Sequence, residues 1–345
     1  MTTLQSTAAA IERTPTVSVP SERAKLVYIL AASHSGSTLL ALLLAAHPRV
    51  STVGELKLGH LGDPEQYLCS CREKLTRCTF WAQLSAEMSR RGHELDPTRA
   101  GTDFATDATP YVTRLLKPLH RGRLLETVRD SLLACSPHWR RNLPRIQERN
   151  AALVRSVLAV SNASAVVDSS KTGLRLKYLL RNPALDVHVV RLIRDGRGVA
   201  LTYMDPGRFA DARDPSLRGG GTGRSNNTYV MPIERAARLW RRSNEEADET
   251  VRSVPPERVI TVRYEDLCAD TDAVLERLFD FVGVDPGERV REFRRVQRHV
   301  VGNGMRLDDS STVALDERWR SVFGPEELAA FERTAGALNR SYGYV

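Results

Sequence analysis

Residues 26–44 constrain the fold of this chain more than any other segment. They read LVYILAASHSGSTLLALLL: an apolar run of strand length, a short polar turn and an apolar segment of helical pattern. A continuous apolar run predicts a strand buried on both faces of a parallel sheet. In the turn, Gly36 allows the backbone to approach a ligand closely, and the free N–H groups of the helix that follows favour anions. The stretch therefore predicts a phosphate-binding corner; a plain serine-capped corner is the alternative.

Further along the chain, strands alternate with helices. Strand patterns occur at 25–32, 50–53, 165–168, 187–193 and 259–264, with helical patterns between them. This alternation predicts an α/β fold, a P-loop-type parallel sheet flanked by helices. We expect one domain at 23–345 after a disordered tail at 1–22. A helical insertion at about 82–160 and a polar, glycine-rich lid loop at about 205–229 are expected to frame the binding site.

Composition limits the possible partners. The 345 residues carry 50 Lys plus Arg against 42 Asp plus Glu, a net charge of +8, and the arginines are spread along the chain. With aromatic residues at only 6%, this favours a small phosphorylated ligand over nucleic acid. We find no signal peptide and no apolar run long enough for a membrane span. Five cysteines, an odd number, argue against a disulfide framework, so we predict a cytoplasmic protein; the oligomeric state stays open.

The polar turn lacks two features of nucleoside triphosphate chemistry. The pattern GxxxxGK[ST] is not satisfied, because the lysine and the second glycine are missing. A phosphosulfate needs less, since a transferred sulfuryl group carries less charge than a phosphoryl group, and backbone amides with hydroxyls are then sufficient. We therefore expect no metal to be required. A P-loop kinase or nucleotide hydrolase, and a non-catalytic nucleotide sensor, are the alternatives.

A second anion site is predicted where the strand at 187–193 ends. Arg194 follows this strand directly and offers a planar fork for a phosphate. Thr202 lies in the helix that follows and adds a hydroxyl. The alternative for Arg194 is a salt bridge to Asp195 or to a neighbouring carboxylate. Two such strand ends in one sheet indicate a ligand with phosphates at two places.

Four motifs in this order resemble the sulfotransferases that use 3′-phosphoadenosine 5′-phosphosulfate (PAPS). They are SHSGSTLL at 33–40, RDGRGVALTY at 194–203, VRYEDL at 262–267, and HVVGNGMR at 299–306 with Trp319; the helical middle of the chain is poorly matched. The resemblance implies that the 3′-phosphate binds Arg194 and Thr202, and that a C-terminal loop closes over the nucleotide. The implied 5′-phosphosulfate ligands are Ser33, His34, Ser35, Gly36, Ser37 and Thr38, and the implied closing residues are Gly302, Asn303 and Arg306.

The tyrosylprotein branch of this family adds candidates for catalysis. In that branch the loop and its helix are followed by His-Pro and then by Gly-Glu, whose glutamate is the general base. This chain has His47-Pro48 and Gly54-Glu55 in the same order. Glu55 is therefore the candidate base and Lys171 the candidate stabiliser of the transferring sulfonate. Without the resemblance, a solvated loop carboxylate and a surface lysine are the ordinary interpretations.

His34 departs from the family pattern, which places lysine or arginine at this position. Beside two anionic groups the protonated ring is favoured, so we predict a general acid or an electrostatic stabiliser of the leaving phosphate. A helix-capping histidine is the alternative.

The sequence does not decide the chemical state of the three cysteines at 69–78. Cys69, Cys71 and Cys78 are interpreted as free thiols, a labile disulfide or a zinc site with His60 as the nearest fourth ligand, although Cys-x-Cys is not the usual structural spacing. The sequence as a whole predicts a sulfotransferase that moves the sulfuryl group of PAPS to a hydroxyl or phenol of a small molecule, which we expect to be a secondary metabolite.

Overall fold

The computed structural model describes residues 23–59, 61, 63, 65–117, 122–209 and 231–345. The tail predicted at 1–22 and most of the loop predicted at 205–229 lie outside the described residues, as does His60.

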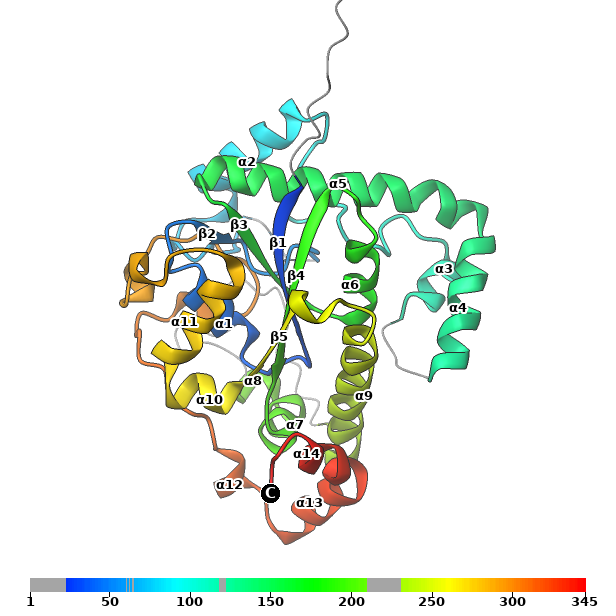
Figure 1. Cartoon of the computed structure of the whole chain (residues 1–345), viewed down its shortest axis with the longest axis vertical. Helices are drawn as coiled ribbons and strands as arrows, with labels where there is room; N and C mark the ends of the chain where they lie inside the picture. Colours follow the sequence, from blue (N-terminus) through cyan, green and yellow to red (C-terminus); the bar gives the residue numbers. More distant parts are fainter. Residues whose placement is uncertain (1–22, 60, 62, 64, 118–121, 210–230) are drawn as a thin grey trace, which may run out of the picture.

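A five-stranded sheet forms the centre of the molecule (Figure 1). Its strands pair in the order β2-β3-β1-β4-β5, and all four pairings are parallel. The predicted α/β class is thereby confirmed. The strands are β1 (Ala24–Ala31), β2 (Val50–Thr52), β3 (Ala165–Lys171), β4 (Leu185–Ile193) and β5 (Val259–Arg263).

Both faces of the sheet are buried, which explains why its strands read as unbroken apolar runs. In β1, Leu26, Tyr28 and Leu30 pack into one core cluster, and Val27, Ile29 and Ala31 pack into another on the opposite face. The first face is covered by α5 (Pro137–Ser161) and α6 (Gly173–Leu180); the second is covered by α1 (Ser37–Leu44) and α11 (Thr271–Val282).

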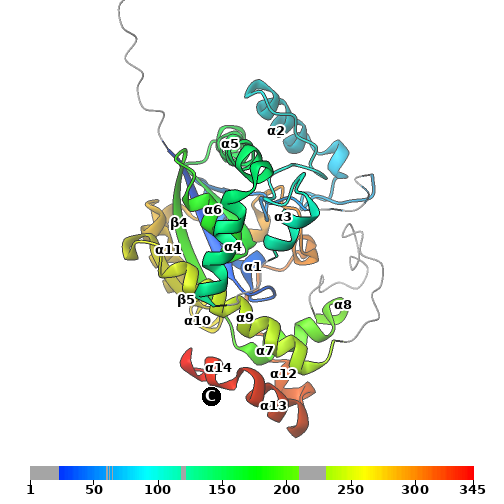
Figure 2. The ribbon, with the colours of Figure 1, turned by 90° about the vertical axis from the view of Figure 1, so that its right-hand side faces the viewer.

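The remaining helices surround this framework (Figures 1 and 2). In the sequence, α5 lies between β2 and β3, and it runs across the sheet. Figure 1 places α3 and α4 beyond α6, away from the strands. The segment predicted as a helical insertion, 82–160, thus includes α5, which packs directly on one face of the sheet. The other helices are α2 (Thr79–Arg90), α3 (Pro110–Leu115), α4 (Arg123–Cys135), α7 (Gly196–Met204), α8 (Pro206–Phe209), α9 (Ile233–Val251), α10 (Tyr264–Ala269), α12 (Trp319–Val322), α13 (Pro325–Phe331) and α14 (Ala337–Ser341).

The parallel register brings the predicted site residues to one edge. Leu30 of β1 aligns with Lys171 of β3, and Ile193 of β4 aligns with Arg263 of β5. The turn after β1, the residues after β2, the end of β3 and Arg194 after β4 therefore share the carboxyl edge of the sheet, where ligands of such folds bind.

Candidate active site

The turn between β1 and α1 has the geometry of an anion cradle. Gly36 has a φ of 88°, and a Cβ atom there would lie 2.6 Å from the Tyr264 ring, so only glycine fits. Helix α1 begins at Ser37 with no side-chain cap, which leaves its first N–H groups for a ligand. Ser35 is buried, and its Oγ has no partner among the described residues. The unpartnered hydroxyl and amides match what a bound phosphate group would satisfy.

His34 lies in this turn with a left-handed backbone, at a φ of 66°. Its ring meets the Tyr203 ring edge-on at a centroid distance of 4.9 Å. Its carbonyl accepts a hydrogen bond from Arg194 Nη1 at 2.8 Å. Tyr203 belongs to α7, so the histidine links the turn after β1 to the helix after β4. Its predicted role as acid or stabiliser stays a prediction.

Arg194 is buried and already engaged. Besides the His34 carbonyl, it contacts Asp316 Oδ2 through Nη2 at 2.9 Å, and its guanidinium stacks 4.6 Å from the Tyr264 ring centroid. The expected alternative of a salt bridge is realised with Asp316, whereas Asp195 pairs with Arg197 at 2.7 Å. Burial raises the pKa of Asp316, but the hydrogen bonds and charges of Arg318 and Arg194 outweigh it, and the pKa is lowered well below the usual range.

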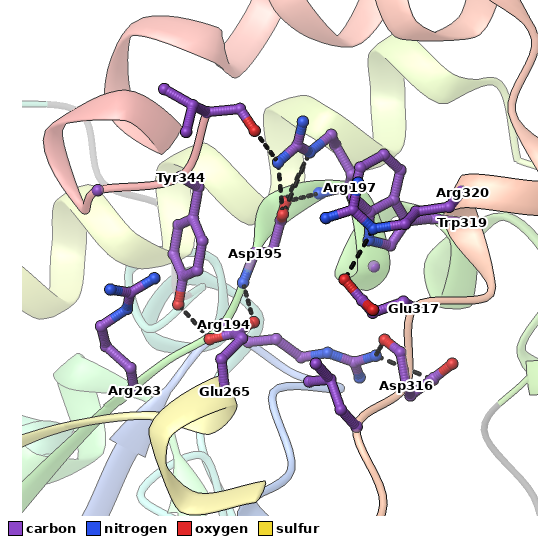
Figure 3. A pocket seen from close by; sticks show the side chains of 14 residues that line it. Arg194, Asp195, Arg197, Arg263, Glu265, Asp316, Glu317, Trp319, Arg320 and Tyr344 are labelled. Carbon is purple, nitrogen blue, oxygen red and sulfur yellow. Dashed lines mark hydrogen bonds and ion pairs between the residues drawn. The ribbon is translucent and has the colours of Figure 1, made fainter. Parts of the chain in front are cut away.

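A pocket of about 210 Å³ adjoins Arg194 (Figure 3). The Trp319 ring forms part of its wall, with the guanidinium groups of Arg197 and Arg320 at 4.1 and 4.6 Å from the ring centroid. Acidic and basic side chains both line it, so an anionic group bound here would meet arginine guanidinium groups and would compete with the carboxylates beside them. Its charged lining residues are Arg194, Asp195, Arg197, Arg263, Glu265, Asp316, Glu317 and Arg320.

Thr202 is held inside α7. Its buried hydroxyl donates to the Gly198 carbonyl at 3.0 Å. As a phosphate ligand, Thr202 would have to exchange this bond for one to the phosphate.

Glu55 and Lys171 form an ion pair through Glu55 Oε1, and Lys57 approaches Oε2 at 3.0 Å. Burial raises the pKa of Glu55, but the charges of Lys171 and Lys57 outweigh burial and lower it from 4.5 to about 2. Lys171 has a φ of 73°, an unusual backbone for a non-glycine residue, at the end of β3. The sequence predicted both members of this pair, and it did not single out Lys57.

Buried polar contacts fix the position of Glu55. Asp168 Oδ1 accepts hydrogen bonds from the amides of Leu56 at 3.0 Å and Ser170 at 2.9 Å, and Arg175 Nε donates to its other oxygen at 3.2 Å. Gly54 has a φ of 93°, and a Cβ there would lie 2.3 Å from the Val301 carbonyl oxygen. The turn that carries the carboxylate is therefore held between β3 and the C-terminal segment.

The predicted closing residues lie in that segment. Gly302 donates its amide to Tyr67 Oη at 2.7 Å, and the Asn303 side chain accepts from the Met305 amide at 2.9 Å. Arg306 is buried and donates to the carbonyls of Leu68 and Gly302, each at 2.7 Å. These contacts indicate that Arg306 stabilises the turn at Gly302 by joining it to the segment at Leu68.

The three clustered cysteines meet a histidine that sequence reasoning did not assign. Cys78 Sγ lies 3.2 Å and Cys69 Sγ 3.8 Å from His299 Nδ1, and Cys71 Sγ lies 3.7 Å from Cys78 Sγ. All three cysteines are free. His299 is 221 residues from Cys78, so no local spacing could have linked them.

Comparison with known proteins shows a similarity to one family of enzymes. Residues 186–288, which include β4, Arg194, Thr202 and β5, match the sequence profile of the sulfotransferase family. Over these residues the chain is similar to the sulfotransferase family. It is also 28% identical over 184 residues to carbohydrate sulfotransferase 5 of Mus musculus, a match that covers 50% of this chain and 45% of the mouse protein.

Two solved sulfotransferase structures are among the chains that resemble this one. The sulfotransferase domain of the curacin biosynthetic pathway has 19% identity and a TM-score of 0.49, covering 93% of this chain and 98% of that domain. Sulfotransferase STF9 from Mycobacterium avium has 12% identity and a TM-score of 0.47, covering 93% and 78%. Because these similarities are low, the description of the fold rests on the strand order and register of this chain itself. Over the described part of the chain, no helix is both long and apolar enough to cross a membrane.

Proposed function

We propose that this sulfotransferase moves the sulfuryl group of PAPS to a hydroxyl or phenol of a small molecule, for which a secondary metabolite is the candidate class. One observation carries the proposal: the Glu55–Lys171 ion pair lies at the same sheet edge as the uncapped start of α1. A base, a cation and an anion cradle at one edge are what in-line sulfuryl transfer to an oxygen nucleophile requires.

The cosubstrate would occupy two anion sites. The 5′-phosphosulfate binds the turn Ser33, His34, Ser35, Gly36, Ser37 and Thr38. The first amides of α1 are available there, as is the Ser35 hydroxyl, which has no partner among the described residues. The 3′-phosphate binds Arg194 and Thr202. Because Asp316 contacts Arg194, the phosphate either replaces this carboxylate or shares the guanidinium with it. The turn with Gly302 and Asn303 covers the nucleotide.

Proton transfer would follow from a rearrangement of the Glu55 ion pair. With Lys171 bound, the Glu55 carboxylate is a weak base, because its pKa is about 2. When a sulfonate draws Lys171 toward itself, Glu55 loses its strongest counter-charge and becomes more basic. Glu55 then takes the acceptor proton while the acceptor oxygen forms a bond to sulfur. The bond from sulfur to the bridging phosphate oxygen breaks, and 3′-phosphoadenosine 5′-phosphate (PAP) leaves.

His34 would act on the leaving group. It lies in the turn assigned to the 5′-phosphosulfate, and its backbone is fixed by Arg194. A protonated ring there neutralises the charge that develops on the phosphate. Replacement by lysine should keep turnover and replacement by alanine should lower it; full turnover in both variants would remove His34 from the mechanism.

Ligand preference and turnover test the proposal. In a thermal-shift assay, PAP should raise the melting temperature of the protein, and ATP with Mg²⁺ should leave it unchanged. In a turnover assay, PAPS should support sulfation of members of a panel of phenols, alcohols and sugars. Glu55→Gln should lower turnover by about 10²–10⁴-fold while PAP still binds. The matched control is Glu65→Gln, since Glu65 is exposed. ATP hydrolysis with no PAP binding would instead support the P-loop kinase alternative.

A further inference from the structure

Four ligand atoms converge outside the sheet edge. The sulfur atoms of Cys69, Cys71 and Cys78 and a ring nitrogen of His299 all lie within 4.8 Å of one another. Zinc bonds of about 2.3 Å to sulfur and 2.0–2.1 Å to nitrogen, in a tetrahedron, place two sulfurs about 3.8 Å apart and a sulfur about 3.5 Å from the nitrogen. The observed separations are 3.7 Å for Cys71 to Cys78, and 3.2 and 3.8 Å for His299 to Cys78 and Cys69. The cluster has the size of a zinc site.

A disulfide fits this cluster poorly. A bonded pair of sulfurs lies about 2.05 Å apart. The Sγ atoms of Cys71 and Cys78 lie 3.7 Å apart, a non-bonded contact of the length found between two ligands of one metal ion. With three sulfurs and one imidazole, the ligand set is soft and typical of zinc.

The local backbone also suits a metal-binding turn. Arg72, directly after Cys71, has a φ of 67°, and its amide bonds to the Cys69 carbonyl at 2.8 Å, which closes a tight turn around the first two sulfurs. Cys78 stands at the N-cap of α2, where the first N–H groups of the helix favour a negatively charged, metal-bound thiolate. The Phe80 ring stacks on the His299 ring at 4.6 Å, nearly parallel, and so holds the imidazole in place.

We propose that Cys69, Cys71, Cys78 and His299 bind one structural Zn²⁺ ion. Four protein ligands fill the tetrahedron and leave no position for a substrate, so the ion is structural and separate from sulfuryl transfer. The thiol protons pass to solvent as the sulfurs bind the metal, and no electron is transferred.

The ion would join two distant parts of the chain. Cys69 and Cys71 lie beside the Tyr67–Leu68 segment, whose polar groups contact Gly302 and Arg306. His299 precedes Val301, which forms a bridge with Gly54 next to the proposed base. Zinc therefore fixes the C-terminal turn that is proposed to cover the nucleotide.

Metal content and spectroscopy test this site. The full chain, purified without chelators, should contain about one zinc per chain by mass spectrometry of the metal. After exchange, Co²⁺ should give the d–d and thiolate charge-transfer bands of tetrahedral cobalt. Alkylation should modify Cys69, Cys71 and Cys78 only after zinc is removed, whereas Cys135, which is exposed, should react in both states.

Variants separate this cluster from other cysteines. His299→Ala and Cys71→Ser should lower zinc content at least several-fold, Cys135→Ser should retain it, and His299→Cys should restore a four-ligand site. If a variant fails to fold, the cobalt spectrum of the native chain still decides the question. Absence of both zinc and cobalt bands, or a mass two hydrogens lighter from a Cys71–Cys78 disulfide, would overturn the proposal. Whether PAPS supports sulfation is decided separately, by the turnover assay.

Discussion

Glu55 lies between two lysines, and only one of them is expected to serve the chemistry. Lys171 comes from the end of β3 and Lys57 from the turn of Glu55 itself. Lys171→Met should lower turnover with PAPS by about 10²–10³-fold, because it removes the cation proposed to stabilise the sulfonate. Lys57→Met removes an equal positive charge from beside the other carboxylate oxygen, and it should lower turnover less than tenfold.

The pH profiles of these two variants test whether Glu55 is the titrating base. Either substitution removes a charge that lowers the Glu55 pKa, so the acid limb of kcat/KM should move to higher pH in both variants. The measurement is the rate with PAPS and a reactive phenol across the acid range. An acid limb unmoved by both changes would show that Glu55 is not the titrating base.

The lowered pKa of Glu55 also predicts pH-dependent stability. A carboxyl whose folded pKa is below its unfolded value stabilises the fold above the unfolded pKa, and the contribution is lost as pH falls from 4.5 through about 2. Wild type should exceed Glu55→Gln by about 2–3 kcal/mol at neutral pH, and the gap should shrink below pH 4.5. Denaturant unfolding at several pH values measures it. A gap that is constant with pH would contradict the ion pair's role in the fold.

Arg194 is expected to distinguish ligands that carry a 3′-phosphate from those that lack it. Arg194→Lys loses the planar fork, so affinity for PAP should fall about 10–100-fold, whereas affinity for AMP, which has no 3′-phosphate, should change little. Arg197→Lys, in the same pocket, is the control. Calorimetric titration with both nucleotides measures the difference. Equal losses for PAP and AMP would place the 3′-phosphate elsewhere.

At the scale of elements, the turn between β1 and α1 depends on the helix that follows β5. Gly36 has a positive φ and packs against the ring of Tyr264, the first residue of α10. Gly36→Ala should destabilise the fold by about 1–3 kcal/mol and abolish measurable PAP binding, because the methyl group displaces the ring and the cradle. Gly92→Ala is a matched control, since Gly92 has a φ of 80° and open space around it. Similar effects of both substitutions would show that backbone strain alone is responsible.

Sequence reasoning could predict the elements of the site because each carries its own local signal. The turn residues, Glu55, Lys171 and Arg194 each lie at or just after the end of a strand, and parallel strands end at one edge. Contacts that join distant segments had no such signal. Asp316 on Arg194 and His299 beside the cysteines depend on the path of the C-terminal segment. No periodicity or spacing encodes that path.

At the scale of the whole molecule, the class of fold could be predicted from apolar runs that alternate with helical patterns. A sheet that is buried on both faces needs such apolar strands, and helices between them to cover it. The order β2-β3-β1-β4-β5 did not follow, since several strand orders satisfy the same pattern. The segment at 82–160 shows the same limit: its helical character was predicted, but α5 as the cover of the sheet was not, because covering a sheet and lying outside it require similar amphipathic patterns.

The distribution of charge over the sheet edge predicts that catalysis needs no magnesium. The groups proposed to meet the phosphosulfate are amides, hydroxyls, His34 and Lys171, and the nearby carboxylate Glu55 is already paired with two lysines. A divalent ion would have to compete with both lysines for that carboxylate. Turnover with PAPS should therefore be equal, within twofold, with and without added Mg²⁺. The proposed zinc, with its four protein ligands, should be unaffected by this change. A rate that rises tenfold or more with Mg²⁺ would indicate metal-assisted phosphoryl chemistry and favour the kinase alternative.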